Sequence, residues 1–365
     1  MVYRAIGLMS GSSLDGLDIV FAEIEENGGK WTYEILHADC YPYPAEWIKK
    51  LKDATQLSAL DYQLLHTEYG HYLGKQVNRF IKENELEYKV GLVASHGHTT
   101  FHVPSKKMTA QLGDGAAIAA STQLPVVSDL RAMDIAFGGQ GAPIVPIGEK
   151  LLLGDYDYFL NLGGIANISV NADTYIAFDI CAANRVLNIL AADAGKEYDE
   201  GGKMAAAGIV NEELLEKLNN LEYYRQSHPK SLANDFGTDI VYLIIKNASL
   251  AANDALRTYT EHIAIQIKNS IAGLNNQKPK TKNQKLLATG GGAFNTFLID
   301  RLKDQLNELK IDVIIPNEKL VKYKEALIMA LIGVLRWREE TNVLSSVTGA
   351  ARDSVGGALW MGQEE

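Results

Sequence analysis

Residues 157–170 read DYFLNLGGIANISV. Apolar residues dominate both sides of the Gly163-Gly164 pair, and a third apolar run, Tyr175 to Phe178, follows before Asp179. Short apolar runs bounded by glycine are typical of strands joined by tight turns. The stretch therefore predicts a strand, a glycine turn, a returning strand and a third strand.

The same pattern occurs near the N-terminus, where residues 7–18 read GLMSGSSLDGLD. An apolar run from Ala5 to Met9 enters this turn, a run from Leu17 to Ala22 leaves it, and Trp31 to Leu36 supplies the third run. Each copy leads towards a segment with helical periodicity. Two such units, one in each half of the chain, predict a duplicated α/β lobe.

A third glycine cluster, residues 290–292, follows the apolar strand Lys285 to Ala288 and precedes an expected helix over residues 295–309. Glycine lets a ligand approach the backbone closely, and a helix N-terminus offers unpaired N–H groups to phosphate. The first turn also carries Asp15 and Asp18, whose carboxylates could hold a hydrated Mg²⁺. An ordinary polar hairpin explains any single turn equally well, but three turns in similar settings favour phosphate or nucleotide contact.

The composition is that of an ordinary globular protein, with 365 residues, 47% hydrophobic and 22% charged. A formal net charge of −10 without a dense basic stripe argues against nucleic-acid binding. The two cysteines, Cys40 and Cys181, fall in different expected lobes, which favours a reducing compartment over a disulfide framework. No signal peptide is evident, and the apolar run Ala326 to Leu335 is half as long as a membrane span. We therefore expect a cytoplasmic protein with no membrane partner.

The length favours two domains. Three glycines and a proline in residues 138–143 interrupt the alternation of strands and helices, and this segment is the expected crossing between the lobes. The C-terminal tail is rich in Gly, Ser and Thr and is expected to pack back on the first lobe. The expected lobes are residues 1–137 plus 345–365 and residues 138–344.

Several short motifs occur in order along the chain. They are Gly-Ser-Ser-Leu-Asp-Gly-Leu-Asp at 11–18, Ser-His-Gly at 95–97, Gln-Leu-Gly-Asp-Gly at 111–115, Asp-Leu-Arg at 129–131, Gly-Gly-Gln-Gly-Ala-Pro at 138–143, Asn-Leu-Gly-Gly-Ile-Ala-Asn at 161–167, Phe-Asp at 178–179 and Gly-Gly-Gly at 290–292. Together they resemble the anhydro-N-acetylmuramic acid kinases, a family of bacterial cell-wall (peptidoglycan) recycling enzymes. The resemblance extends from Gly7 to about Trp337, and the first and fifth motifs are its most specific parts.

The resemblance implies the two-lobed α/β fold of the actin, Hsp70 and sugar-kinase superfamily, with duplicated RNase H-like domains and ATP in the cleft. It also implies a reaction in two parts. Water opens the 1,6-anhydro bridge of the muramic acid, and the released O6 takes the γ-phosphoryl group of ATP. The implied partner is a small amino sugar and the implied cofactors are ATP and Mg²⁺. Phosphoryl transfer depends on positioning and charge neutralisation, which glycine turns and a cation supply.

The expected nucleotide contacts come from the three turns. The first would cradle the β- and γ-phosphates with Asp15 or Asp18 as the Mg²⁺ ligand, the second would close on the same phosphates, and the third would meet the adenosine. The residues are Gly11, Ser12, Ser13, Leu14, Asp15, Gly16, Leu17, Asp18, Gly163, Gly164, Gly290, Gly291 and Gly292.

Asp179 is the expected catalytic residue. A carboxylate at a strand end suits a general base. The resemblance implies that Asp179 activates the water that attacks C1. The alternative is a structural carboxylate, either at the N-cap of the helix expected over residues 184–192 or in a loop.

The expected sugar contacts are His96, Arg131 and Glu325. The planar guanidinium of Arg131 suits a substrate carboxylate such as the lactyl group, with a structural ion pair to Asp134 as the alternative. Glu325 matches a sugar-contacting Glu of the family, but it could equally complement a helix dipole from the first turn.

His96, His98 and His102 are close enough in sequence to suggest a zinc site or a metal-dependent hydrolase. The family has His at the positions of His96 and His102 and commonly Gln at that of His98. This difference favours sugar hydrogen bonds over a metal.

The chain departs from the family pattern at residues 181–184 and 228–235. The phosphate turns are nearly intact, with Ser12 in place of the usual Thr, so ATP use is better supported than the identity of the sugar. The alternatives are a kinase of the same fold acting on a different amino sugar and a catalytically silent nucleotide-binding module. The oligomeric state is left open, with a homodimer as one candidate.

Overall fold

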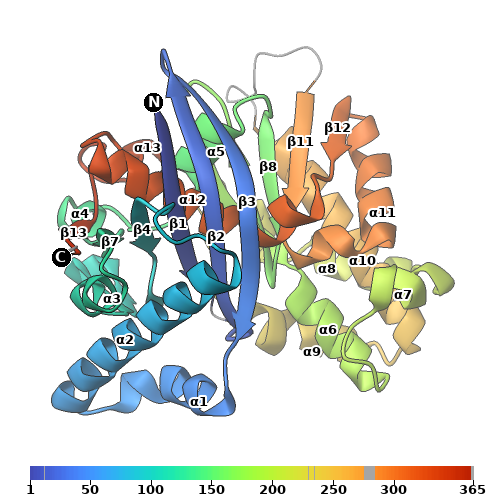
Figure 1. The fold of residues 1–365 in the computed structure, drawn as a ribbon. Helices are drawn as coiled ribbons and strands as arrows, with labels where there is room; N and C mark the ends of the chain where they lie inside the picture. The colour runs from blue at the N-terminus through green and yellow to red at the C-terminus, as the bar shows by residue number, and fades with distance from the viewer. Residues whose placement is uncertain (12, 229, 234, 275–283, 363–365) are drawn as a thin grey trace. The chain divides into compact units, whose positions relative to one another are not determined.

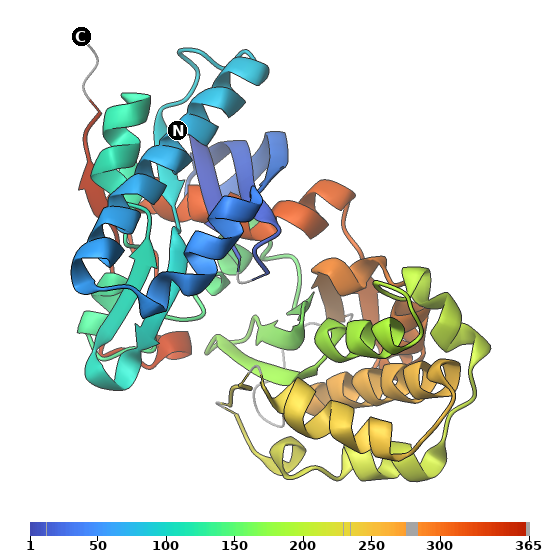
Figure 2. The same ribbon diagram turned by 90° about the horizontal axis from the view of Figure 1, so that it is seen from below.

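The computed structural model describes residues 1–11, 13–228, 230–233, 235–274 and 284–362. The chain divides into two compact units (Figures 1 and 2). The first comprises Met1–Leu153 with Tyr323–Glu365, and the second comprises Gly154–Lys322. Each unit has its own sheet and its own hydrophobic core.

The first unit is built on a six-stranded sheet with the order β13-β7-β4-β1-β2-β3, whose long strands β1 to β3 are drawn in blue in Figure 1. The three N-terminal strands are antiparallel, whereas β4 runs parallel to β1 and β7 runs parallel to β4. A separate hairpin pairs β5 with β6. The strands are β1 Val2–Ser10, β2 Gly16–Asn27, β3 Lys30–Pro42, β4 Leu92–Ser95, β5 His98–Val103, β6 Met108–Leu112, β7 Val126–Ser128 and β13 Ala358–Trp360.

Helix α12 packs directly on the central strands of this sheet. A Cβ on Gly7 of β1 would lie 1.9 Å from the carbonyl oxygen of Ala326, and a Cβ on Gly333 would lie 2.5 Å from the Cβ of Ala94. Both glycines therefore let helix and sheet approach more closely than any side chain allows. The helices of this unit are α1 Ala45–Asp53, α2 Ala59–Glu83, α3 Gly115–Thr122, α4 Ala132–Ala136, α5 Pro146–Leu152, α12 Glu318–Trp337 and α13 Ser345–Thr348. Helix α12 begins in the second unit, to which residues 318–322 belong.

The second unit repeats the same arrangement of strands. Its sheet has the order β10-β9-β8-β11-β12, with β8, β9 and β10 antiparallel and β11 parallel to both β8 and β12. The order matches that of β3-β2-β1-β4-β7 in the first unit, so the duplication predicted from the two glycine turns is confirmed. The strands are β8 Tyr158–Leu162, β9 Ile165–Val170, β10 Ile176–Ala182, β11 Gln284–Thr289 and β12 Ile311–Ile314.

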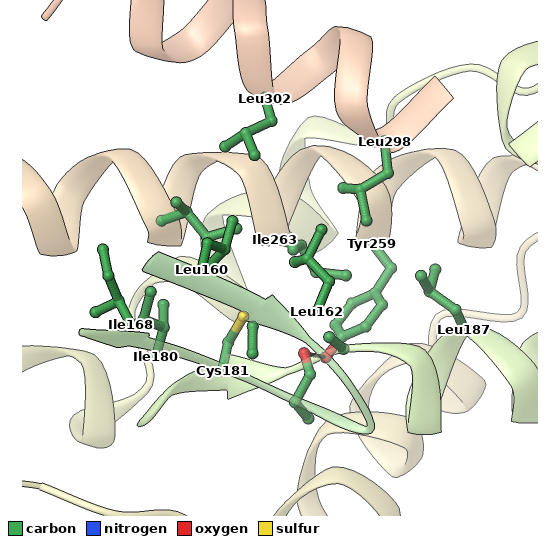
Figure 3. Close-up of a cluster of buried hydrophobic side chains, with 14 of the residues drawn as sticks. Leu160, Leu162, Ile168, Ile180, Cys181, Leu187, Tyr259, Ile263, Leu298 and Leu302 are labelled. Carbon is green, nitrogen blue, oxygen red and sulfur yellow. Dashed lines mark hydrogen bonds between the residues drawn. The ribbon is translucent and has the colours of Figure 1, made fainter. Parts of the chain in front are cut away.

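The core of the second unit lies between its sheet and helices α10 and α11 (Figure 3). Leu160 and Leu162 of β8 are fully buried in it with Ile263 of α10. The buried Tyr259 of α10 donates its hydroxyl hydrogen to the carbonyl of Ala182 at 2.8 Å, which satisfies the one polar atom of that side chain. The helices are α6 Asn184–Asp193, α7 Lys203–Ala207, α8 Glu212–Asn219, α9 Tyr242–Asn247, α10 Ala252–Ala272 and α11 Thr296–Asn307.

The division between the units differs from the expected lobe boundaries. Residues 138–153 and 323–344 lie in the first unit, so the chain crosses after Leu153 and again after Lys322 rather than at the glycine-rich residues 138–143. The reason is packing between distant segments, because α5 and α12 both join the first unit and a Cβ on Gly148 would lie 2.5 Å from Ile328. The expected return of the C-terminal tail is seen in β13, which pairs with β7.

The two cysteines, Cys40 and Cys181, are both free thiols, as the sequence predicts. Across the described residues, no helix combines the length and the apolar character that a bilayer span requires.

Candidate active site

The first glycine turn connects β1 to β2 in the first unit. Ser10 pairs with Leu17 across the hairpin, and the amide of Leu14 donates to the carbonyl of Gly11 at 3.4 Å. Gly16, Leu17 and Asp18, expected to contact the nucleotide, lie in β2 and not in the turn, and the side chain of Leu17 is buried in the core. Ser12, expected to contact phosphate, lies outside the described residues.

The second glycine turn joins β8 to β9 and is tied to the start of α6. The carbonyls of Gly163 and Gly164 accept hydrogen bonds from the amides of Asn184, at 3.1 Å, and Ala183, at 2.8 Å. The side chain of Asn184 donates to the carbonyl of Leu162 at 2.8 Å. The turn and the helix N-terminus therefore form one rigid piece of backbone.

The third glycine cluster lies beside the second because their strands are neighbours. Thr289 at the end of β11 is the register partner of Asn161 in β8, and Gly290 follows it. A Cβ on Gly292 would lie 3.0 Å from Oδ1 of Asn184. The structure thus brings the second and third predicted turns together around Asn184, within one unit.

The glycines of the three turns fall into two groups according to the room for a side chain. In one group a Cβ would meet the protein no closer than ordinary van der Waals contact and the backbone is not left-handed: Gly11, Gly163, Gly164 and Gly291. In the other group a Cβ would lie 2.5–2.7 Å from other atoms: Gly16, Gly290 and Gly292. The fold itself requires the second group. The protein's own packing does not require glycine at the first group. The absence of a side chain there would let a ligand come close to the backbone N–H groups.

Replacing Gly290 by Ala should therefore destabilise the protein. Gly290 has a φ of +82°, and its Cβ would lie 2.5 Å from Asn161 Oδ1. Left-handed backbone at a non-glycine residue costs about 1–3 kcal/mol, and the clash adds to it. A thermal melt should show a lower Tm for Gly290→Ala and an almost unchanged Tm for Gly291→Ala. Equal melting of the two variants would contradict the grouping.

A group of carboxylates lies beside the first turn. Burial raises the pKa of Asp18 to about 6, a hydrogen bond with Cys40 opposes this, and the negative charges of Glu325 and Asp15 raise the pKa further. The structure therefore brings the two expected Mg²⁺ ligands into one electrostatic neighbourhood with Glu325. A cation bound here would offset their repulsion.

No cluster of three or more His, Cys, Asp or Glu side chains that could hold a metal occurs in the described ranges. The three histidines considered as a zinc site instead make separate contacts. His96 contacts Arg131, His98 contacts Ser10 and His102 contacts Thr109.

His96 supports Arg131 with one ring nitrogen and the backbone with the other. Its Nε2 accepts a hydrogen bond from Arg131 Nε at 2.9 Å, and its Nδ1 donates to the carbonyl of Gly97 at 2.9 Å. Burial, reinforced by the guanidinium, lowers the pKa of His96 to about 3, so the ring is neutral and can accept. Because both nitrogens are used, a direct hydrogen bond from His96 to a sugar is unavailable in this arrangement.

Arg131 is held by neutral groups and not by the alternative ion pair. Its Nη1 donates to the carbonyl of Gly141 at 2.5 Å, and no ion pair within 4 Å joins it to Asp134. Asp134 instead accepts from the amide of Gly141 at 2.7 Å and from the hydroxyl of Thr348 at 2.7 Å. The negative charges of Glu325 and Asp134 act on Arg131 from a distance.

Asp179 lies in the middle of β10 and not at its end, where the sequence predicts it; it pairs with Asn167 of β9, and a register shift follows between Asp179 and Cys181. Its Oδ2 accepts a hydrogen bond from the amide of Leu232 at 2.9 Å, and its carbonyl accepts from the hydroxyl of Tyr223 at 2.7 Å. Burial raises the pKa of Asp179, while the hydrogen bond from Leu232 opposes the shift. The carboxylate caps no helix: Ala183 stands at the N-cap of α6, and no side chain caps it.

Glu325 lies in α12 just after the one interruption of its helical geometry, at Tyr323. It follows Lys324, whose Nζ forms a buried ion pair with Glu149 Oε1 of α5 at 2.8 Å. Because Tyr323 interrupts the helix, Glu325 lies in the first turn of the helical segment that follows, and the helix-dipole alternative stays open. Its charge acts on Asp18 and Arg131, as a residue facing the first turn does.

Sequence reasoning missed the residues that lie behind the first turn. Ser10, Tyr43 and Tyr69 are buried and joined by hydroxyl hydrogen bonds. Their spacing in the sequence carries no signal, because they come from β1, from the residue after β3 and from α2. Only the assembled sheet and helix bring them together.

Two units with the same strand order, each carrying a glycine turn between its first two strands, form a duplicated α/β fold, as the resemblance predicts. The anhydro-N-acetylmuramic acid kinase family matches residues 3–362. The chain belongs to this family.

Curated relatives of the same name support the assignment. The anhydro-N-acetylmuramic acid kinase of Francisella tularensis subsp. novicida is 34% identical, with 94% of this chain and 95% of the relative covered. Those of Sulfurovum sp. and Clostridioides difficile are 32% and 33% identical, covering 98% and 95% of this chain and 99% and 95% of the relatives. The match thus spans both units.

Proposed function

We propose that this protein opens 1,6-anhydro-N-acetylmuramic acid with water and phosphorylates O6 with ATP, giving N-acetylmuramic acid 6-phosphate for cell-wall recycling. Water adds to C1, the C1–O6 bond breaks, O6 bonds to the γ-phosphorus and ADP leaves. The observation that carries the proposal is the group of open glycines at the turns, together with a half-buried Asp179 that caps no helix.

The phosphate side of the proposal rests on the open glycines. Gly11, Gly163 and Gly164 would offer backbone N–H groups to the β- and γ-phosphates, and Gly291 would lie against the adenosine. Mg²⁺ would be held by Asp15 or Asp18 together with water and phosphate oxygens, because Mg²⁺ usually keeps several waters and few protein ligands. The raised pKa of Asp18 supports a nearby cation, since a bound cation would keep this carboxylate ionised.

The sugar side rests on Arg131, Glu325 and Asp179. Nε and Nη1 of Arg131 bond to His96 and Gly141, which leaves Nη2 for the lactyl carboxylate of the substrate. His96 then acts as a positioning residue for Arg131. Asp179 would accept a proton from the water that attacks C1, and its amide contact with Leu232 would hold the carboxylate in place.

A panel of anhydro and free amino sugars tests the proposal. ATP consumption should occur with 1,6-anhydro-N-acetylmuramic acid, and mass spectrometry should find a product heavier than the substrate by one water and one phosphoryl group. Activity with another amino sugar alone would favour the second kinase hypothesis. ATP binding without any transfer would favour a silent nucleotide-binding module.

The affinity for Mg·ATP should fall as the pH falls through about 6. The pKa of Asp18 is raised to about 6, so its carboxylate is ionised above that pH and neutral below it. A neutral carboxyl attracts Mg²⁺ less, and the affinity should follow the ionised fraction. Titration calorimetry between pH 5 and 8 measures this. The Asp18→Asn variant should bind Mg·ATP more weakly, and its affinity should not change near pH 6. A change near pH 6 that persists in this variant would assign the titration to another group.

The proposed reaction takes place where ATP is available, so a cytoplasmic location is part of the proposal. A homodimer remains a prediction, and light scattering coupled to size-exclusion chromatography would measure the mass in solution.

A further inference from the structure

His98 is a buried histidine to which the reaction above gives no role. It begins β5, its side chain is 7% exposed, and its Nδ1 lies 3.0 Å from Ser10 Oγ. Ser10 is the last residue of β1 and precedes Gly11, an open glycine of the first turn. The imidazole therefore lies next to the turn that is proposed to hold phosphate.

A series of hydroxyl groups fixes the position of the proton on this ring. Tyr43 donates its hydroxyl hydrogen to Ser10 Oγ at 2.8 Å, and the hydroxyl oxygens of Tyr43 and Tyr69 lie 2.6 Å apart. Because Tyr43 has a single proton to give, Tyr69 is the donor in the second bond.

The hydroxyl proton of Ser10 can then go to His98 Nδ1, which lies 3.0 Å from Ser10 Oγ, or to the hydroxyl oxygen of Tyr69, and we assign it to His98 Nδ1 because Tyr69 is already engaged with Tyr43 at 2.6 Å. A nitrogen that accepts carries no proton, so the proton of the neutral imidazole is on Nε2. Burial lowers the pKa of His98, which keeps the ring neutral at neutral pH. Tyr69, Tyr43 and Ser10 thus select one tautomer.

The Nε2–H of His98 is left available to a ligand. None of the described residues forms a hydrogen bond with it, and it is not one of the fully buried polar atoms without a partner. The electrostatic influence of His98 reaches His96, and both ring nitrogens of His96 are in use. Of these two histidines, His98 is the one that can donate outward.

We propose that His98 donates a hydrogen bond from Nε2 to an oxygen of the sugar substrate, and that Ser10, Tyr43 and Tyr69 are positioning residues that maintain this donor. The inference rests on the proposed function and names a further contact in the same site. A neutral imidazole suits an uncharged sugar oxygen, whereas phosphate oxygens are matched best by cations and by backbone N–H groups. Arg131, which contacts His96 two residues before His98, belongs to the proposed sugar side of the site as well.

Nitrogen-15 NMR of the histidine side chains tests the tautomer without any assay of activity. The wild-type spectrum should show His98 protonated on Nε2, and Tyr43→Phe should shift the population towards protonation on Nδ1. A wild-type ring protonated on Nδ1 would overturn the proposed order of donors. This measurement stands even if the protein phosphorylates no anhydro sugar, in which case the proposed function fails separately.

Steady-state kinetics with 1,6-anhydro-N-acetylmuramic acid and Mg·ATP test the contact. His98→Leu should lower kcat/KM for the sugar about tenfold, the usual effect of one lost neutral hydrogen bond, with the KM for ATP unchanged. His98→Gln, which restores a neutral N–H donor, should recover much of this loss, and Tyr43→Phe should lie between the two.

The matched control is His71→Leu, since His71 is an exposed histidine whose Nδ1 also bonds to a serine, Ser121, at 3.0 Å. It should leave both constants unchanged. An unchanged kcat/KM for the sugar in a folded His98→Leu would overturn the proposal, as would a loss confined to the KM for ATP. If His98→Leu fails to fold, the comparison of His98→Gln with Tyr43→Phe decides the same question.

Discussion

Asp179→Asn should lower turnover of the anhydro sugar by about 10²–10⁴-fold, the usual effect of losing a positioned general base. The amide keeps the size of the carboxylate and can still accept the hydrogen bond from Leu232, but it cannot take a proton from water. Ring opening and phosphoryl transfer should fall together, because O6 becomes an acceptor only when the bridge breaks. Rates of ADP release and of product formation, followed by mass spectrometry, measure both steps.

Asp199→Asn is the matched control for this variant. Asp199 also lies in the second unit, and its carboxylate accepts hydrogen bonds from the amides of Met204 and Ala205 at 2.8 and 2.9 Å. A purely structural carboxylate should affect the melting temperature and not the turnover. Asp179→Asn should do the reverse, with ATP affinity nearly unchanged. Wild-type turnover by Asp179→Asn, or a loss explained by unfolding in a circular dichroism melt, would remove Asp179 from the mechanism.

Gly11→Val should weaken ATP binding by at least about 100-fold, or about 2.8 kcal/mol, while the protein stays folded. Within the described residues, the one atom found within 4 Å of a Cβ at this position is Ser13 Oγ, 3.6 Å away, so the free protein leaves room for a Cβ here. It would occupy the space in which the phosphates are proposed to contact the backbone. Titration calorimetry with a non-hydrolysable ATP analogue and Mg²⁺ measures the affinity.

Gly91→Val is the control for Gly11→Val within the same unit. Its Cβ would lie 3.5 Å from the carbonyl of Arg4, so it also adds a side chain at ordinary contact distance, away from the three turns. It should bind the analogue as wild type does. Equal affinity in Gly11→Val and wild type would place the phosphate contacts elsewhere.

Much of the fold can be predicted from the sequence because its signals are local. Apolar runs around Gly163 and Gly164 mark β8 and β9, and apolar residues at helical spacing mark α2 and α10. The division into units could not be predicted in this way. It depends on contacts such as the one between Gly7 and Ala326, which are more than three hundred residues apart in the sequence.

The candidate site shows the same limit. Glycine clusters and Asp179 are visible as motifs, but the roles of neighbouring histidines are not. His96 and His98 are separated by one residue, yet Arg131 engages one and Ser10 the other. Those partners come from different elements, so a linear pattern cannot assign them. The distinction between open and filled glycines likewise depends on atoms that are distant in the chain.

The way in which the chain threads through its two units has a consequence for protein synthesis. The second unit is one continuous segment, Gly154–Lys322, whereas the first needs both its N-terminal part and Tyr323–Glu365. Strands β1 and β4 are covered by α12, which the ribosome makes only after the whole second unit. Domains generally fold as units and N-terminal ones fold first during synthesis. Here the order of completion is reversed, because the synthesis of the first unit ends after that of the second. Its central strands remain uncovered by α12 until the ribosome has made residues 323–337.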